Sequence, residues 1–321
     1  MNIGIMGKIH PDGLEVFKSN NISFIDLESF DKDYLIKNLK NVDGIVLRTA
    51  RLDKDILKEL TKLKIISRHG VGYDNVDIDF LNDNKIALAI TGTANSVSVA
   101  EHVMTMILNL TKNIVNYDKL VKSGNFIKKY EIGDFYELYN KKILILGFGR
   151  IGKALAKRCL GFEMKVYVYD PFVSEEEINK YNCISIDKSS GFEIADYISI
   201  HLPLNKDTKK LISYKEFKIF KKNTILINTA RGGIVDEKAL YEALKNNDIL
   251  GAGLDVYEEE PLNDSPLFSL NNIILTPHNA ALTLECRKRM AVEGAENIIK
   301  YLKNKDAMNL NNVVNKKEIG I

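Results

Sequence analysis

The 321-residue sequence predicts an α/β fold of two domains, each built on a parallel sheet with helices on both faces. The length exceeds one ordinary core and suits two domains of roughly 150 residues. Short, continuously apolar runs alternate with helical segments over the first ninety residues, and this alternation restarts near residue 142. Because strands of a parallel sheet are buried on both faces, they are typically apolar throughout.

The first alternating region contains five predicted strands: Ile3–Met6, Ile22–Ile25, Gly44–Leu47, Leu63–Ser67 and Ile86–Ile90. Polar segments with helical spacing separate them: Asp12–Lys18, Asp31–Leu39, Asp53–Leu60 and Asp77–Asn82. Asp12, Asp31 and Asp53 stand where a helix cap or an acidic first turn is favoured.

The second region begins with one long predicted helix, Ser98–Lys122, and a polar, aromatic-rich stretch, Lys122–Asn140. Six strands are then expected: Lys142–Leu146, Lys165–Tyr169, Tyr197–Ile200, Thr224–Asn228, Gly251–Asp255 and Ile273–Leu275. A last amphipathic helix, Leu284–Lys303, has little of this sheet left to cover, so we expect it to return to the first domain. The predicted domains are residues 1–98 plus 282–321, and residues 99–281.

Composition indicates a globular protein of a reducing compartment. Hydrophobic residues make up 45% and charged residues 27%, and the net charge of +2 favours neither nucleic acid nor anionic membrane. The three cysteines lie far apart without zinc-ligand spacing, so no metal is expected. The first residues read as a strand rather than a signal peptide, and no apolar run reaches the roughly 18 residues of a membrane span. We therefore expect a cytoplasmic protein.

A glycine motif with the spacing GxGxxG follows the predicted strand Lys142–Leu146 and opens a predicted helix, Arg150–Leu160. The first glycine permits a tight turn, the second lets the backbone approach a pyrophosphate, and the third lets helix and strand pack closely. The helix N-terminus adds free N–H groups and a positive dipole end. This context predicts a dinucleotide site at Gly147, Phe148, Gly149, Arg150, Ile151 and Gly152.

Asp170 ends the next predicted strand, eighteen residues beyond Gly152. An acid at this place hydrogen-bonds the adenosine ribose hydroxyls and repels a 2′-phosphate. Pro171 follows, with no Arg or Lys immediately after it. The sequence therefore favours NAD over NADP.

Arg231 follows the predicted strand Thr224–Asn228, at the carboxyl edge where doubly wound sheets bind ligands. Two glycines come directly after it, which suits a guanidinium fixed to grip a carboxylate bidentately. The alternative is a surface arginine paired with Asp236 or Glu237.

His278 follows the predicted strand Ile273–Leu275, at the same edge, and is one of only five histidines. The stretch after Gly251–Asp255 ends in three consecutive acids, and we interpret Glu258 and Glu259 as a solvated loop. A histidine beside a predicted nicotinamide is a better catalytic candidate than an isolated one, although most histidines are structural.

Two further segments, Ser67–Asp77 (SRHGVGYDNVD) and Asn95–His102 (NSVSVAEH), complete a recognisable order of motifs. Together with the strand ends above, they resemble the D-isomer-specific 2-hydroxyacid dehydrogenase family, which includes D-3-phosphoglycerate dehydrogenases. The resemblance covers nearly the whole chain. It implies a Rossmann NAD-binding domain and a flavodoxin-like substrate domain.

The resemblance also implies roles for individual residues. Arg231 would bind the substrate carboxylate and carbonyl, and His278 would be the general acid/base, paired with Glu260. Backbone N–H groups of Val71 and Gly72 would hold the substrate carboxylate. Arg48 and Asn95 would line the substrate side. Besides the glycine motif, the cofactor residues would be Asp170, His201, Pro203, Thr208, Thr229 and Asp255.

The chemistry of hydride transfer to a 2-oxo acid fits these residue types. Negative charge develops on the carbonyl oxygen, which needs a proton and a nearby cation. Histidine supplies a proton near neutral pH, and arginine orients the acid and stabilises the developing charge. This chemistry requires no metal.

Several readings stay open at the level of sequence. The favoured substrate pair is 3-phosphoglycerate/3-phosphohydroxypyruvate, because Arg48 and Arg51 would suit a second anionic group; solvated arginines are the alternative. Hydroxypyruvate or glyoxylate, D-lactate-like acids, formate and phosphite remain possible substrates. An NAD-sensing, corepressor-like binding protein is the runner-up from another class, and the complete set of Arg231, Glu260 and His278 argues against it.

Two expectations concern assembly and regulation. The chain ends soon after Asn311–Asn315, so we expect no regulatory serine-binding domain. Members of the family are usually dimeric through the cofactor domain, and we expect a homodimer here. The range Asn113–Asn140, with Tyr117, Phe126, Tyr130, Phe135 and Tyr136, would form the contact unless it packs within its own chain.

Overall fold

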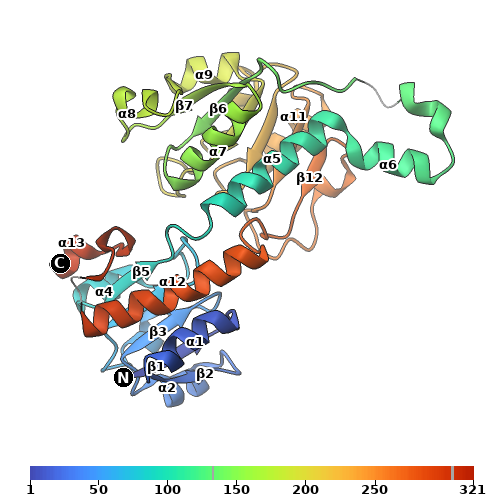
Figure 1. The fold of residues 1–321 in the computed structure, drawn as a ribbon. Helices are drawn as coiled ribbons and strands as arrows, with labels where there is room; N and C mark the ends of the chain where they lie inside the picture. Colours follow the sequence, from blue (N-terminus) through green and yellow to red (C-terminus); the bar gives the residue numbers. More distant parts are fainter. Residues whose placement is uncertain (132–133, 305–306) are drawn as a thin grey trace. The chain divides into compact units, whose positions relative to one another are not determined.

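The computed structural model describes residues 1–131, 134–304 and 307–321. The chain forms two compact units: Met1–Asn95 with Leu282–Ile321, called unit 1, and Ser96–Ala281, called unit 2 (Figure 1). Each unit has its own parallel sheet with helices around it, which confirms the predicted α/β class.

Unit 1 holds a five-stranded sheet in the order β2-β1-β3-β4-β5, with every neighbouring pair parallel. This is the flavodoxin-like order, as the family resemblance implied. Its elements are β1 (Asn2–Met6), α1 (Pro11–Ser19), β2 (Ser23–Asp26), α2 (Lys32–Leu39), β3 (Gly44–Leu47), α3 (Lys54–Leu57), β4 (Ile65–Arg68), α4 (Ile78–Asp83), β5 (Ala87–Ile90), α12 (Leu284–Lys303), η4 (Leu310–Asn312) and α13 (Lys316–Ile319).

Local sequence accounts for most boundaries in unit 1. Asp31 and Asp53 cap α2 and α3 with their side chains, and Asp12 lies in the first turn of α1, whose cap is His10. Alternating side chains of β1 enter two cores, because Ile3 and Ile5 pack with α1 and α12 while Met6 belongs to the core on the other face. Helix α12 covers one face of this sheet, as its return to the first domain predicted.

Unit 2 holds a seven-stranded parallel sheet in the order β12-β11-β10-β9-β6-β7-β8. Counted from β6, this is the Rossmann order with one added strand. Its elements are α5 (Ser96–Lys112), α6 (Ile114–Lys122), η1 (Phe126–Tyr130), β6 (Lys142–Leu146), α7 (Arg150–Gly161), β7 (Lys165–Tyr169), α8 (Glu175–Asn179), β8 (Ile184–Ser185), α9 (Lys188–Ile194), β9 (Tyr197–Ile200), α10 (Tyr214–Phe217), β10 (Ile225–Asn228), α11 (Glu237–Lys245), β11 (Gly251–Leu254), η2 (Pro266–Ser269) and β12 (Ile273–Leu275).

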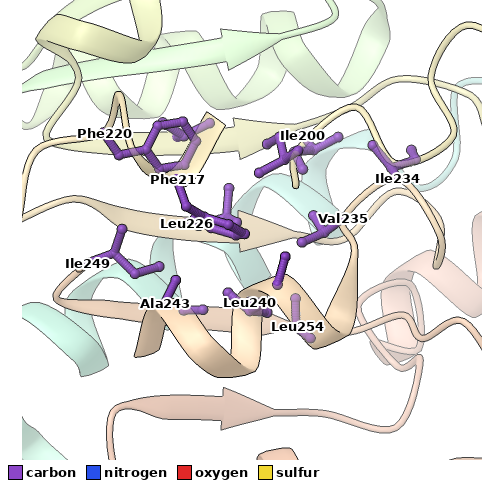
Figure 2. Close-up of a cluster of buried hydrophobic side chains, with 14 of the residues drawn as sticks. Ile200, Phe217, Phe220, Leu226, Ile234, Val235, Leu240, Ala243, Ile249 and Leu254 are labelled. Atoms are coloured by element: carbon purple, nitrogen blue, oxygen red, sulfur yellow. The ribbon is translucent and has the colours of Figure 1, made fainter. Parts of the chain in front are cut away.

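Both faces of this second sheet are buried. Leu144 and Leu146 of β6 enter the core that α9, α10 and α11 cover, whereas Ile143 and Ile145 enter the core beneath α5 and α7. Figure 2 shows the first of these cores, where Leu226 of β10 lies between the aromatic rings of Phe217 and Phe220 and the side chains of α11. Burial on both faces explains why the strands read as uninterrupted apolar runs.

Two details differ from the sequence prediction. The single long helix is broken at Asn113, whose φ of 53° is left-handed, so that α5 ends at Lys112 and α6 starts at Ile114. Asparagine tolerates this conformation better than most residues, which makes it a natural break point. The edge strand β8 was not predicted, because two residues are too short to show an apolar period. Within the described ranges, no helix combines the length and apolarity needed to cross a membrane.

Candidate active site

The glycine motif lies where the strand order of unit 2 reverses, between the carboxyl ends of β6 and β9. Gly147 has a φ of 96°, and a Cβ there would lie 2.6 Å from the carbonyl oxygen of His201. A Cβ on Gly152 would collide with the carbonyl oxygen of Gly147. The turn therefore needs glycine at both positions, as the tight turn and the close helix–strand packing predicted.

The middle glycine leaves room for a ligand. Apart from its two chain neighbours, no described residue has an atom within 4 Å of a Cβ built on Gly149, which is the N-cap of α7 and gives that helix no side-chain cap. At the end of β7, the Asp170 carboxylate accepts hydrogen bonds from Phe148 N at 2.7 Å and Phe172 N at 2.9 Å. A fixed acid thus stands beside an open helix N-terminus, the arrangement that binds a pyrophosphate and an adenosine ribose.

Three buried polar atoms at the same sheet edge have no hydrogen-bond partner in the described part of the chain: His201 Nδ1, Thr229 Oγ1 and Asn279 Oδ1. They follow β9, β10 and β12 respectively. Burial lowers the pKa of His201 to about 3, so its ring is neutral, and Nε2 lies 2.8 Å from Ser199 Oγ. Since buried polar atoms are normally satisfied, this row fits the polar groups of a dinucleotide.

Pro203 and Thr208 close the loop that follows His201. The Thr208 hydroxyl donates to the Pro203 carbonyl at 2.6 Å and accepts from Asn205 N at 2.8 Å. Thr208 thereby shapes the loop near the glycine turn. The described residues include no group of three or more His, Cys, Asp or Glu side chains arranged to hold a metal ion.

Arg231 lies in a turn clamped by Asn228, the last residue of β10. The buried Asn228 side chain donates to the Arg231 carbonyl at 2.9 Å and accepts from Ala230 N at 3.0 Å. Gly232 packs so tightly against the Tyr257 carbonyl that any Cβ would overlap it. This contact brings the arginine turn against the segment that carries Glu260. The alternative partner Asp236 is paired with Lys210 at 3.0 Å.

His278 and Glu260 form the pair that the family resemblance implied. His278 Nδ1 lies 2.7 Å from Glu260 Oε2, and Glu260 Oε1 accepts from Tyr257 N at 3.0 Å. An ionised carboxylate only accepts, so a neutral imidazole carries its proton on Nδ1 and its lone pair on Nε2. The His278 side chain is 54% exposed, as a group that meets a ligand must be.

Asp255 holds the loop that presents His278. Its side chain, 1% exposed, accepts from Thr276 Oγ1 at 2.6 Å, Asn279 N at 2.9 Å and Ala280 N at 3.0 Å. His278 itself has a φ of 49°, an unfavourable conformation for a residue with a Cβ. The carboxylate of Asp255 is thus engaged on both sides of the strained residue, and it fixes where the imidazole points.

Unit 1 places the remaining predicted residues at the carboxyl edge of its own sheet. Arg48 follows β3 and donates to the Lys8 carbonyl, beside the end of β1, where the strand order reverses. The N–H groups of Val71 and Gly72, after β4, donate to no acceptor among the described residues. Asn95 is buried, and its Oδ1 has no partner in the same part of the chain.

Arg68 was not predicted as a functional residue, yet it shapes the Val71–Gly72 loop. Its guanidinium donates to the carbonyls of Gly72 and Leu47, each at 2.7 Å, and also to the Arg48 carbonyl. Next to it, burial and the charges of Arg48 and Arg68 lower the pKa of His69 to about 4. Asn228, Tyr257 and Thr276 were missed as well, because single polar residues at or after the end of a strand carry no pattern of their own.

The fold and the site define a dinucleotide-binding α/β protein with a histidine–carboxylate pair at the sheet edge. The family model for the NAD-binding domain of D-isomer-specific 2-hydroxyacid dehydrogenases matches residues 104–280. The chain therefore belongs to this family, and unit 2 carries its NAD-binding domain.

Relatives within the family carry several names. The chain is 35% identical over 318 residues to a D-3-phosphoglycerate dehydrogenase of Methanocaldococcus jannaschii, covering 98% of this chain and 60% of that protein. It is 40% identical over 285 residues to a glyoxylate reductase of Thermococcus litoralis, covering 87% and 86%. A solved D-lactate dehydrogenase of Aquifex aeolicus, complexed with NAD and lactic acid, superposes with a TM-score of 0.84 at 27% identity, covering 98% and 99%. The chain thus spans less than two thirds of the first relative's length.

Proposed function

We propose that this protein catalyses reversible hydride transfer between NAD(H) and a small 2-hydroxy/2-oxo acid. The observation that carries the proposal is the His278–Glu260 pair at 2.7 Å, which stands on the same sheet edge as the glycine turn. Bound NAD(H) would supply the hydride donor or acceptor. The residues proposed to hold it are Gly147, Gly149, Arg150, Ile151, Gly152, Asp170, His201, Pro203, Thr208, Thr229 and Asp255.

The proposed roles of the side chains follow from their contacts. With Nδ1 committed to Glu260, His278 Nε2 exchanges the proton of the substrate hydroxyl. Arg231, held by its clamped turn, orients the substrate carboxylate and stabilises charge on the carbonyl oxygen. The adjacent, unengaged N–H groups of Val71 and Gly72 are proposed to hold the carboxylate, since paired backbone donors bind anions well. Asn95 is proposed to contact the substrate with its unpartnered Oδ1.

The leading substrate pair is 3-phosphoglycerate/3-phosphohydroxypyruvate. Arg48 stands at the reversal point of the unit 1 sheet, where ligands bind in flavodoxin-like folds, and burial together with the charges of Arg48 and Arg68 lowers the pKa of the neighbouring His69. These positive charges suit a second anionic group on the substrate. The similarity to a D-3-phosphoglycerate dehydrogenase supports this reading.

A second candidate is reduction of glyoxylate or hydroxypyruvate. It is favoured by the similarity to a glyoxylate reductase along most of that protein's length and to a hydroxypyruvate reductase of Thermotoga maritima. These small acids have no second anionic group, so Arg48 would contribute little to binding them. The two candidates therefore differ in what Arg48 does.

A panel assay distinguishes the candidates. NADH oxidation would be followed with 3-phosphohydroxypyruvate, hydroxypyruvate, glyoxylate and pyruvate, for wild type and Arg48→Ala. We expect kcat/KM to be highest for the phosphorylated acid and to fall about 10- to 100-fold for it alone in Arg48→Ala, since a charged hydrogen bond contributes about 1.5–3 kcal/mol. Lys62→Ala, which removes an exposed cation ahead of β4, is the control. A wild type that reduces none of these acids contradicts the proposed function.

We also propose that the chain acts as a homodimer through α6 and η1. These elements stand away from the sheet of their own unit (Figure 1) and expose large apolar side chains, among them Ile127 at 88% and Tyr130 at 86%. The predicted contact range 113–140 includes residues 132–133, which lie outside the described residues. Light scattering on the assayed sample checks the dimer, and a mass of 36.3 kDa would contradict it.

A further inference from the structure

His102 on α5 joins the network that holds the His278 loop. Its Nε2 lies 3.1 Å from Thr276 Oγ1, and that hydroxyl lies 2.6 Å from Asp255 Oδ1. The direct distance from His102 Nε2 to Asp255 Oδ1 is 3.7 Å. All three residues belong to unit 2, and the proposed chemistry uses neither His102 nor Thr276.

The direction of these hydrogen bonds follows from which of the three side chains can donate a proton and which can only accept one. An ionised Asp255 carboxylate only accepts, so the single hydroxyl proton of Thr276 is directed to it at 2.6 Å. The same hydroxyl oxygen must then accept from His102, which requires the proton of that ring to be on Nε2. The chain of donors therefore runs from His102 through Thr276 to Asp255.

The end of this chain bears on His278. Asp255 accepts from Asn279 N and Ala280 N as well as from Thr276, so its hydrogen bonds flank His278 on both sides along the sequence. His278 has a left-handed φ of 49°, which surrounding contacts must maintain. If the Thr276 hydroxyl were free to rotate, one of the three bonds that orient the carboxylate would weaken.

We propose that His102 is a positioning residue for the acid/base histidine. Its Nε2–H fixes the Thr276 hydroxyl toward Asp255, and Asp255 in turn keeps the backbone at 278–280 in the conformation that points His278 Nε2 at the substrate. This inference rests on the proposed function, because a displaced His278 is detected through a lower kcat. A displacement of about 1 Å at a reacting group lowers rates by about 100-fold, which sets the scale of the effect.

Paired variants separate this role from bulk stability. We expect His102→Leu and Thr276→Val each to lower kcat by about 10- to 100-fold, with a smaller rise in KM for NADH because Asp255 is also a proposed cofactor residue. His102→Gln keeps an N–H at the reach of Nε2 and Thr276→Ser keeps the hydroxyl, so both should recover most of the lost turnover. The double variant His102→Leu/Thr276→Val should be no slower than either single variant, since both break one chain.

Thr105→Val is the matched control. Thr105 lies one turn along on the same helix, is exposed, and donates only to its own helix at the Glu101 carbonyl. Loss of the Thr105 hydroxyl should leave kcat unchanged. Wild-type turnover in His102→Leu, or equal loss in His102→Leu and His102→Gln, would overturn the positioning role while leaving the proposed function intact.

A measurement independent of turnover keeps the two proposals apart. Nitrogen-15 NMR of the imidazoles should show His102 as the Nε2–H form in the wild type, and this preference should weaken in Thr276→Val. An Nδ1–H form in the wild type would overturn the positioning role of His102, even if the protein reduced none of the acids tested.

Discussion

Both sheets of this protein are parallel and reverse their strand order once, but they present different chemistry at their carboxyl edges. Unit 2 offers a glycine turn, a fixed acid and a histidine–carboxylate pair. Asp255 restrains the His278 loop, and Asn228 restrains the turn of Arg231. Unit 1 offers cationic side chains and backbone N–H groups after β3 and β4. The order of parallel strands therefore decides where a ligand site forms, whereas the residues after each strand decide what it binds.

Two histidines with a lowered pKa show the same contrast in electrostatics. His201 in unit 2 has a pKa near 3 because of burial alone, with Ser199 beside it. His69 in unit 1 has a pKa near 4 because burial acts together with the charges of Arg48 and Arg68. The edge of unit 1 thus has a positive field suited to an anion, while the edge of unit 2 keeps a neutral histidine among polar atoms suited to a cofactor.

The largest effect is expected from removing the proposed proton donor of unit 2. We expect His278→Ala to lower kcat by about 100- to 10,000-fold, because general acid–base catalysis usually contributes that much and alanine carries no group that can exchange a proton. NADH affinity, measured by fluorescence titration, should stay within about two-fold. Glu260→Gln should show a smaller loss, since it leaves the imidazole in place. A His278→Ala variant with wild-type turnover contradicts the assignment.

A smaller effect is expected at the ribose end of the same edge. Asp170→Ala removes the carboxylate that is proposed to accept from the ribose hydroxyls and to repel a 2′-phosphate. We expect the ratio of kcat/KM for NADH over NADPH to fall about 10- to 100-fold, with most of the change in KM. Asp170→Asn retains one acceptor oxygen for the Phe148 N–H and should lie between wild type and alanine. An unchanged ratio would show that Asp170 serves only the turn.

The smallest effect is expected in unit 1, and it concerns stability. His69 has a folded pKa of about 4 against an ordinary value near 6.5, so between these pH values the unfolded chain binds the additional proton. Its contribution to stability is therefore complete above pH 6.5 and is lost as pH falls toward 4.

Urea unfolding at several pH values checks this contribution. The free energy of unfolding of wild type should decline more steeply below pH 6.5 than that of His69→Gln, by up to about 1.4 kcal/mol per pH unit. Above pH 7 the difference between the two proteins should be constant. Parallel curves throughout the acid range would contradict a neutral, buried His69.

Sequence patterns predicted most of the fold because the strands of a parallel sheet are buried on both faces and therefore appear as repeated apolar runs. The strands β6, β7, β9 and β12 begin and end where the sequence placed them, and α12 spans the predicted Leu284–Lys303. The break at Asn113 was missed because helical periodicity continues across it, and one left-handed residue leaves no trace in an apolar pattern. The edge strand β8 was missed because it is held by pairing with β7 rather than by its own composition.

The sequence by itself determined the class of fold, the glycine turn and its acid, and Arg231 and His278 as candidates at strand ends, whereas Glu260 was implied only by the family resemblance. These features are local, since each depends on a few consecutive residues and the strand before them. Only the tertiary structure decided that Glu260 meets Nδ1 of His278, that Asp255 ties the His278 loop, and that His102 reaches Thr276. Those contacts join residues up to 174 positions apart, and hydrogen-bond geometry between such distant groups exists only once the sheet has brought its strand ends together.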